Sequence, residues 1–306
     1  MIKFYFLIGL ELIFSPFLYL FEWLKKINGK FIKSSRQKRV DGTPIGNEIL
    51  FVVHEWAGYP FTREKTIKYI NKTFACGLKF HFDRLSNYDG KYNLRKILTI
   101  SDCNDDYVAN LKKQDFFTED FEIYPVLNKA MDFSGYSFAI DKLVDSNKEQ
   151  IVFLTNTSVD SMVVPFIDQY VNIFKSDPSL GLLGISYSTK IYQTLIKNNF
   201  RPHLQSFFLV SRSSVLKELV KSNGGSLPGS EEDYKLSIIR FGEVQITEQI
   251  QKLGFKVAVI TEDKELYTLP DSGPFYNGFF NWKLPFNDYR LSVTHPNRIN
   301  EFKKSS

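Results

Sequence analysis

Two stretches of the sequence place short oxygen-bearing side chains where a helix begins and where a strand ends. In "NKAMDFSGYSFAIDKL" (residues 128–143), Asp132 comes just before Gly135 and a helical pattern. In "QIVFLTNTSVD" (150–160), an apolar run ends in an amide, three hydroxyls and a carboxylate. Free N–H groups at a helix N-terminus hold phosphates, and ligands of open α/β sheets bind beyond the carboxyl ends of the strands. The two stretches together predict a site for a nucleotide diphosphate and a sugar.

Each stretch also has a purely structural interpretation. Asp132 is a residue type that caps helices, and residues 155–160 are types that bond their own backbone in turns. As chemistry, Asp132 suits a ribose, a base or a sugar hydroxyl, and Asp160 suits a divalent cation that carries a diphosphate. Neither G-x-x-x-x-G-K nor G-x-G-x-x-G occurs in the chain, which argues against an ATPase or a dehydrogenase.

Other polar groups interrupt apolar segments. His54 and Glu55 end the run "EILFVVHEW", where they would contact a base or ribose, or else only the neighbouring backbone. His203 and Gln205 alternate along an apolar segment, so they share one face of a predicted strand and suggest a pocket. Glu243 stands at a predicted helix start, as a cap or as the base that takes a proton from an acceptor hydroxyl.

The elements that must position these groups alternate between strand and helix. Such alternation predicts an α/β fold with a mostly parallel sheet flanked by helices. The predicted strands are 48–56, 96–102, 121–127, 151–156, 180–186, 204–212 and 255–261. The predicted helices are 62–74, 136–144, 163–174, 213–222 and 243–254.

The two ends of the chain differ from this central part. Residues 4–24 form an apolar run long enough to span a bilayer, but Glu11, Glu22 and Pro16 interrupt it. The run is either a single crossing or a bent, re-entrant or interfacial helix, with a buried core helix as the third alternative. Between residues 24 and 40 there are seven basic residues and no acid, which suits anionic headgroups. We predict a membrane-associated helix and basic linker (1–39), an enzyme domain (40–270) and an irregular aromatic tail (271–306), on the cytoplasmic face of the cell membrane.

Composition narrows the class of protein. The chain has 306 residues, of which 43% are hydrophobic and 24% charged, as in globular proteins. The net charge of +5 is concentrated in residues 24–40, so the rest lacks the spread basic surface of a nucleic-acid binder. Cys76 and Cys103 are too few for a disulfide framework and lack metal-ligand spacing.

The order of short motifs resembles the rhamnan-synthesis F type of bacterial glycosyltransferases. The series is N-x-x-x-DF-x-GY, a strand ending N-x-S, then "LGLLGIS", "HLQSFFLVSR" and "GEVQITEQIQKLGFKVAVI", and the similarity covers roughly residues 49–262. The matching positions are Asn128, Asp132, Phe133, Gly135, Tyr136, Asn156, Ser158, His203, Gln205, Ser206 and Glu243.

The resemblance implies a GT-A-like, nucleotide-sugar-dependent enzyme of surface polysaccharide assembly, with a lipid-linked glycan as acceptor and Mg²⁺ or Mn²⁺ as cofactor. Two positions depart from the family: Ala130 replaces a usual Gly, and Thr157 replaces a common Asp. Either Asp160 compensates at the metal, or the enzyme works without one. A catalytically silent membrane scaffold and a nucleotidyl or phosphoglycosyl transferase are the alternative functions.

The expected roles follow. Glu243 and Asp132 are the catalytic candidates, and His203 and Gln205 line the acceptor side or pocket. Asp160 is the metal candidate. The residues expected to bind the donor nucleotide are His54, Glu55, Asn128, Gly135, Tyr136, Asn156 and Ser158.

Overall fold

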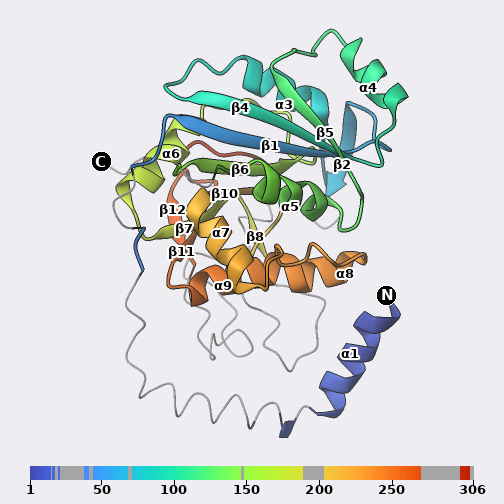
Figure 1. Ribbon diagram of the computed structural model, residues 1–306, viewed down its shortest axis with the longest axis vertical. Helices are drawn as coiled ribbons and strands as arrows, with labels where there is room; N and C mark the ends of the chain where they lie inside the picture. Colours follow the sequence, from blue (N-terminus) through green and yellow to red (C-terminus); the bar gives the residue numbers. More distant parts are fainter. Residues whose placement is uncertain are drawn as a thin grey trace.

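The computed structural model describes residues 1–14, 16–17, 20, 38–40, 44–67, 71–145, 148–188, 203–269 and 297–303. Its centre is an eight-stranded sheet with the strand order β12-β11-β7-β10-β6-β1-β4-β5 (Figure 1). The strands are β1 (Glu48–Trp56), β4 (Asn93–Ser101), β5 (Phe121–Val126), β6 (Ile151–Asn156), β7 (Leu180–Gly184), β10 (Phe208–Arg212), β11 (Lys256–Ile260) and β12 (Leu266–Thr268).

The sheet is mostly parallel. Strand β1 runs parallel to both of its neighbours, β4 and β6, and β5 extends this parallel half. Strands β7 and β11 are also parallel to each other, whereas β10 and β12 run antiparallel to theirs. The predicted Rossmann-like α/β fold, a mostly parallel sheet flanked by helices, is confirmed.

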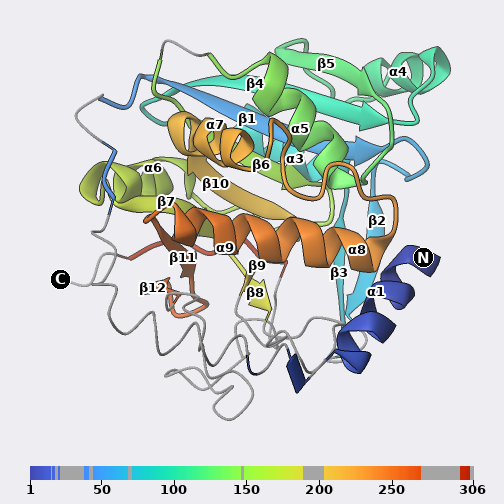
Figure 2. The same cartoon turned by 60° about the horizontal axis from the view of Figure 1, so that its bottom comes forward.

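Helices cover both faces of the sheet, as Figures 1 and 2 show. One core contains side chains of α3 (Leu78–Ser86), α4 (Asp105–Lys112) and α6 (Ile167–Ser176). The other contains side chains of α5 (Asp132–Lys142), α7 (Ser213–Ser222) and α9 (Val244–Lys252). Successive residues of β1 point alternately into the two cores, which explains why its sequence is a continuous apolar run instead of an alternating one.

The predicted helix at 62–74 is wrong. This segment forms a hairpin of β2 (Arg63–Ile67) and β3 (Lys72–Cys76), with Asn71 at φ 48° in the turn. Its burial alternates residue by residue along β2, the period of a strand. Thr66 and Thr73 share a cross-strand hydrogen bond of 2.8 Å, and such β-branched pairs stabilise a hairpin.

Other predictions fail only in their boundaries. The strand predicted at 204–212 is divided into β9 (His203–Leu204), which pairs with β8 (Tyr187–Ser188), and β10. Helix α5 begins at Asp132, four residues before its predicted start. Helices α3 and α4 had not been predicted.

The helix expected to begin at Glu243 begins earlier. Helix α8 (Lys235–Ile238), the π-helical turn η1 (Ile239–Glu243) and α9 follow one another without a break. Glu243 therefore lies inside a long helical run and is not a residue at a free helix N-terminus. A π-helical turn inside an α-helix is uncommon and frequent at functional sites.

The N-terminal helix α1 (Ile2–Ile13) contacts the rim of the domain. Phe4 is buried against Tyr234, at the start of α8, with ring centroids 5.7 Å apart. Figure 2 shows α1 beside this end of α8 and the β2–β3 hairpin. Among the described residues, no helix has both the length and the apolar character needed to cross a bilayer. Association of α1 with a membrane surface stays a prediction.

Two predicted segments lie largely outside the described residues. These are the basic linker between Leu24 and Lys38 and most of the aromatic tail, residues 270–296. The described residues 297–303 pack on the main domain. Ile299 is buried, the Tyr170 hydroxyl donates to the Asn300 carbonyl at 2.6 Å, and the Phe302 N–H donates to Gln169.

Candidate functional site

Two carboxylates meet at Ser206. The Ser206 backbone N–H donates to Glu243 Oε1 at 2.8 Å, and the Ser206 hydroxyl lies 3.4 Å from Asp132 Oδ2. The Asn156 amide donates to the same oxygen of Asp132 at 2.5 Å. His203 Nε2 lies 3.8 Å from Glu243 Oε2. We call this group the carboxylate cluster; it consists of Asp132, Asn156, His203, Ser206 and Glu243.

The fold brings these residues together from three places. Asn156 ends β6, and Asp132 begins α5, whose preceding residue Met131 has the strained φ of 51°. The Ser134 hydroxyl accepts the N–H groups of Lys129 and Ala130, which fixes the loop before the helix. Strained backbone conformations are retained where the surroundings enforce them, often at functional sites.

Buried contacts also fix the Ser206 segment and the helical run that carries Glu243. The Tyr136 hydroxyl, fully buried, donates to the Ser206 carbonyl at 2.9 Å, which fixes the segment between β9 and β10. A Cβ on Gly242 would lie 2.7 Å from the Phe133 ring. Glycine at 242 therefore lets the helical run that carries Glu243 approach α5. The expected donor-binding residue Tyr136 acts here as a support under the cluster.

Burial controls the protonation of Glu243. Its side chain is 12% exposed. Loss of solvation raises the pKa of Glu243 to about 7, although the hydrogen bonds from Ser206 act in the opposite direction. The negative charge of Asp132 raises this pKa further, and Lys235 lowers it. A carboxylate that titrates near neutral pH is suited to accept a proton during catalysis.

Cations on β2 and at the start of α8 act electrostatically on the carboxylate cluster. Along β2 the inner face of the hairpin carries Arg63 and Lys65, and the outer face carries Glu64 and Thr66. Lys65 interacts electrostatically with Asp132, Arg63 and Lys235. Burial lowers the pKa of Lys65, and the charges of Lys235 and Arg63 lower it further, whereas Asp132 raises it.

Arg63 is already bound to a second acid. Its Nη2 donates to the Thr157 hydroxyl at 2.9 Å, Nη1 lies 3.5 Å from Glu55 Oε2, and the guanidinium stacks 4.1 Å from the centre of the Tyr59 ring. The Thr157 hydroxyl also donates to Glu55 at 2.8 Å. Burial raises the pKa of Glu55 to about 7, partly opposed by Arg63. Glu55 is thus held by neighbouring side chains at the end of β1.

His54 lies beneath the start of α5 and not on an open surface. It is 3% exposed, and its Nδ1 is 3.0 Å from the Thr99 hydroxyl. A Cβ at Gly135 would lie 2.3 Å from His54 Nδ1 and 2.2 Å from Thr99 Oγ1. Gly135 is therefore required for α5 to pack on β1 and β4. Burial lowers the pKa of His54 to about 4, so the imidazole is neutral at physiological pH.

The expected metal ligand Asp160 serves the fold. It is 5% exposed, its Oδ1 accepts the Met162 N–H at 2.8 Å, and Arg298 Nε lies 3.8 Å from the same oxygen. Its carbonyl accepts Arg84 Nη2 at 2.7 Å. Ser158 likewise turns its N–H back to Asn156 Oδ1.

In the described part of the chain, the loop after β6 offers few free oxygen ligands to a divalent cation. Mg²⁺ and Mn²⁺ favour several hard oxygen ligands. In the loop after β6, the Thr157 hydroxyl is engaged by Glu55 and Arg63, and Asp160 Oδ1 accepts the Met162 N–H. The described part of the chain contains no group of three or more His, Cys, Asp or Glu arranged to hold a metal.

Two expected site residues make contacts elsewhere. The Asn128 amide donates at 2.8 Å to Asp102, which also accepts the Trp56 indole N–H at 2.7 Å. The Gln205 amide oxygen accepts the Ser186 hydroxyl at 2.7 Å, so it is not paired with His203. Within the described residues, the hydrogen bonds of the Asn128 and Gln205 side chains thus go to Asp102 and Ser186 and not to the two carboxylates of the cluster.

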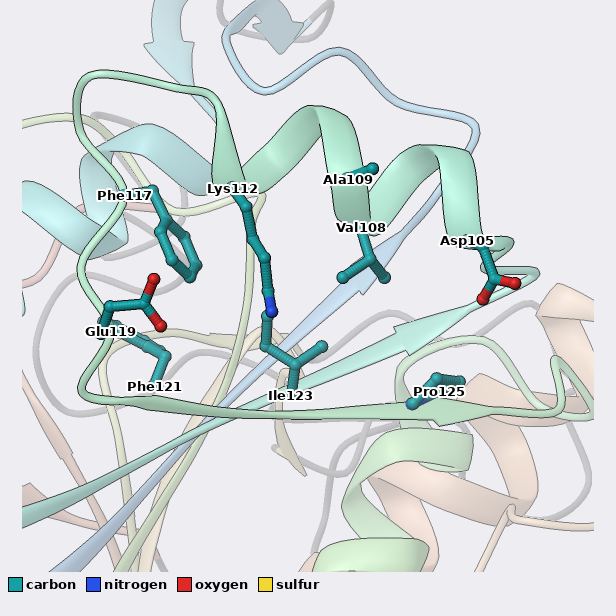
Figure 3. A pocket seen from close by; sticks show the side chains of 9 residues that line it. All are labelled: Asp105, Val108, Ala109, Lys112, Phe117, Glu119, Phe121, Ile123 and Pro125. Atoms are coloured by element: carbon teal, nitrogen blue, oxygen red, sulfur yellow. The ribbon is translucent and has the colours of Figure 1, made fainter.

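A separate groove of about 560 Å³ lies between α4 and the edge strand β5 (Figure 3). Val108, Phe121 and Ile123 form apolar walls, Lys112 extends from α4 toward Ile123, and Glu119 lies on the loop before β5. None of the residues predicted from the sequence to form the site lines this groove.

Sequence reasoning missed Arg63, Lys65 and Lys235. The alternating pattern Arg63-Glu64-Lys65-Thr66 contains a signal for the first two, because a strand would place both cations on one face. Assigning a helix to 62–74 concealed that signal. The sequence contains no such signal for Lys235, because its position near Glu243 depends on the helical run through the π-helical turn η1.

Comparisons with known proteins give structural neighbours only. No protein-family model matches the sequence, and no curated protein matches it. One similar solved structure is the mannosyltransferase PcManGT from Pyrobaculum calidifontis in complex with GDP-Man and Mn²⁺, at TM-score 0.41 and 13% identity over 82% of this chain. This chain spans 64% of that protein's length. Another is 4-diphosphocytidyl-2C-methyl-D-erythritol synthase from Anaerococcus prevotii, at TM-score 0.41 and 11% identity, covering 70% of this chain and 87% of that one.

Proposed function

We propose that this protein is a glycosyltransferase that moves a sugar from a nucleotide-sugar donor to a hydroxyl of a glycan acceptor. The observation that carries the proposal is the carboxylate cluster. It holds two acids at one serine, one of them a buried glutamate with a pKa of about 7, beside the cations of the hairpin. It lies where β6 ends, and ligands of such sheets bind at the carboxyl ends of strands.

The proposed reaction uses the two acids differently. Glu243 takes the proton from the acceptor hydroxyl, whose oxygen forms a bond to the anomeric carbon of the donor sugar. The bond from that carbon to the phosphate oxygen breaks, and the nucleoside diphosphate leaves with the electron pair. Asp132, oriented by the Asn156 amide, accepts a hydrogen bond from a hydroxyl of the donor sugar. A base near its operating pKa contributes roughly 10²–10⁴-fold to rate.

The place of α1 supports a lipid-linked acceptor. Phe4 fixes this helix on Tyr234, one residue before Lys235. Elsewhere on the segment, Ile2, Phe6 and Ile13 are 83%, 64% and 70% exposed. Exposed apolar side chains of this size, followed by the basic residues 25–39, suit an interfacial helix on an anionic membrane surface. The proposal is therefore a role in surface polysaccharide synthesis at the cytoplasmic face of the cell membrane.

The test is release of nucleoside diphosphate by the purified full-length protein from a panel of nucleotide sugars, with and without a lipid-linked acceptor in vesicles. Glu243→Gln and Asp132→Asn should each lower the rate by about 100-fold or more, by the magnitude of general-base catalysis. Glu64→Gln, on the outer face of the hairpin, should leave it unchanged. Equal rates in wild type and Glu243→Gln refute the assignment. Binding of nucleotide sugars without turnover on any acceptor favours the scaffold.

A further inference from the structure

Two lysines, Lys65 and Lys235, act electrostatically on the carboxylate cluster. In the described part of the chain, neither the Lys65 ammonium nor the Lys235 ammonium has an ion pair or a hydrogen bond. Lys252, by comparison, pairs with Glu248 at 2.9 Å. Lys65 is only partly exposed, on the inner face of β2, so it lacks much of the hydration that a surface lysine has.

Two other cations and one carboxylate act on the Lys65 ammonium. Lys235 and Arg63 repel it, and Asp132 is the carboxylate that attracts it. Arg63, on the same face of β2 as Lys65, donates to Thr157, the residue after Asn156 of the carboxylate cluster. Lys235 lies on the helical run that carries Glu243 and acts on that acid. The hairpin and α8 thus each bring a lysine toward the cluster. Leaving cations close together and partly desolvated costs free energy unless an anion joins them. The arrangement suits a multiply charged anion.

The two buried glutamates near these cations have other hydrogen-bond partners. Glu243 Oε1 accepts the Ser206 N–H, and Glu55 Oε1 accepts the Thr157 hydroxyl and the Trp56 N–H. Arg63 is shared with Thr157 and Glu55. Among the described residues, the carboxylates near the three cations are thus engaged by other groups, and a diphosphate could bind to the two lysines.

We propose that Lys65 and Lys235, with Arg63 behind them, neutralise the diphosphate of the donor and of the departing nucleotide, in the position that a divalent cation would take. The inference rests on the proposed function and deepens it: the donor is a nucleoside diphosphate sugar, bound without a metal. When the glycosyl–oxygen bond breaks, the diphosphate gains one negative charge. Fixed ammonium groups aimed at that charge stabilise the transition state.

The experiment measures binding of UDP, GDP, CDP and dTDP to the full-length protein by isothermal titration calorimetry, in EDTA and then in Mn²⁺ or Mg²⁺. We expect one of the nucleotides to bind in EDTA, with a change of less than threefold when metal is added. Lys65→Ala and Lys235→Ala should each weaken that binding tenfold or more, and Lys65→Arg should retain it. Lys252→Ala is the matched control because Lys252 pairs on the surface of α9.

The outcomes separate this inference from the proposed function. Binding that requires Mn²⁺ or Mg²⁺ overturns the inference and leaves the glycosyltransferase proposal standing. Binding in EDTA that neither lysine variant weakens also overturns it. Failure of every nucleotide to bind, with or without metal, removes the proposed function and this inference together. Circular dichroism of each variant shows whether it is folded, and retained binding in Lys65→Arg separates loss of charge from loss of structure.

Discussion

Glu243→Gln is expected to make the protein more stable at alkaline pH while it abolishes activity. Burial raises the pKa of Glu243 to about 7 in the folded protein, from 4.5 as the ordinary value. The folded state therefore retains the proton longer than the unfolded chain, and wild type loses stability as pH rises from 4.5 to 7. Glutamine cannot ionise, so the variant escapes this loss. Its Oε1 can still accept the Ser206 N–H.

The size of the effect follows from the two pKa values. A difference of about 2.5 pKa units corresponds to about 3.4 kcal/mol at pH well above 7, at about 1.36 kcal/mol per unit. Integrated over pH, the advantage of the variant is about 1 kcal/mol at pH 5 and about 3 kcal/mol at pH 8. For a chain of this length, 3 kcal/mol corresponds to a rise in Tm of roughly 5 °C.

Thermal unfolding of wild type and Glu243→Gln from pH 5 to pH 8 measures the gap. A gap that widens with pH supports a buried, reluctantly ionised glutamate at this position. Asp132→Asn should narrow the gap, because the charge of Asp132 raises the pKa of Glu243. Glu64→Gln, on the outer face of the hairpin, should show no pH-dependent gap. A gap that is constant or shrinks as pH rises refutes the reasoning.

Three further predictions concern the residues under the site. Gly135→Ala should lower stability by about 1–3 kcal/mol, as overpacking does, because its Cβ would lie 2.3 Å from His54 Nδ1; in thermal melts Gly9→Ala, with no atom within 4 Å, should not be destabilised, and equal losses would contradict the packing. The pKa of His54 is lowered to about 4, so its NMR signals should not titrate between pH 5 and 8, and a midpoint near 6.5 would contradict its burial. Its folded pKa lies below the unfolded value, so this histidine costs stability only as pH falls below about 6.5. Arg63→Ala should lower the free energy of unfolding more at pH 8 than at pH 5, because loss of the guanidinium raises the pKa of Glu55 further. Denaturant titrations at the two pH values measure this difference. A loss of stability that is the same at both pH values would count against the pairing of Arg63 with Glu55.

The sheet was predictable because its signals are local. Strand β1 reads as a continuous apolar run, and such runs are typical of parallel strands buried on both faces. The hairpin at 63–76 was not predictable in this way, because its lysines and threonines also fit a helical pattern over a short window. Only the pairing of β2 with β3 decides between helix and strand. Pairing is a tertiary interaction, which overrides weak local propensity.

The carboxylate cluster was predictable in part. Asp132, Asn156 and Glu243 were selected from their residue types and positions at element ends, and the fold places the three around Ser206. The same reasoning assigned Gly135 to the donor, although its missing side chain serves helix packing against His54. A polar or small residue at a strand end looks alike in sequence whether it meets a ligand or a neighbouring helix.

The cations were beyond sequence reasoning for a different reason. Lys65 and Lys235 lie 170 positions apart, and only the hairpin and the helical run through η1 bring both to Asp132 and Glu243. Whether a lysine side chain has an ion-pair partner depends on the tertiary structure, which the residues next to it in the sequence do not determine.

The most direct test of the central claim is a structure of the full-length protein with a nucleotide sugar bound. The donor sugar should lie against Asp132 and Glu243, with its diphosphate between Lys65 and Lys235. A nucleotide sugar bound in the groove between α4 and β5, with the carboxylate cluster empty, would contradict the account.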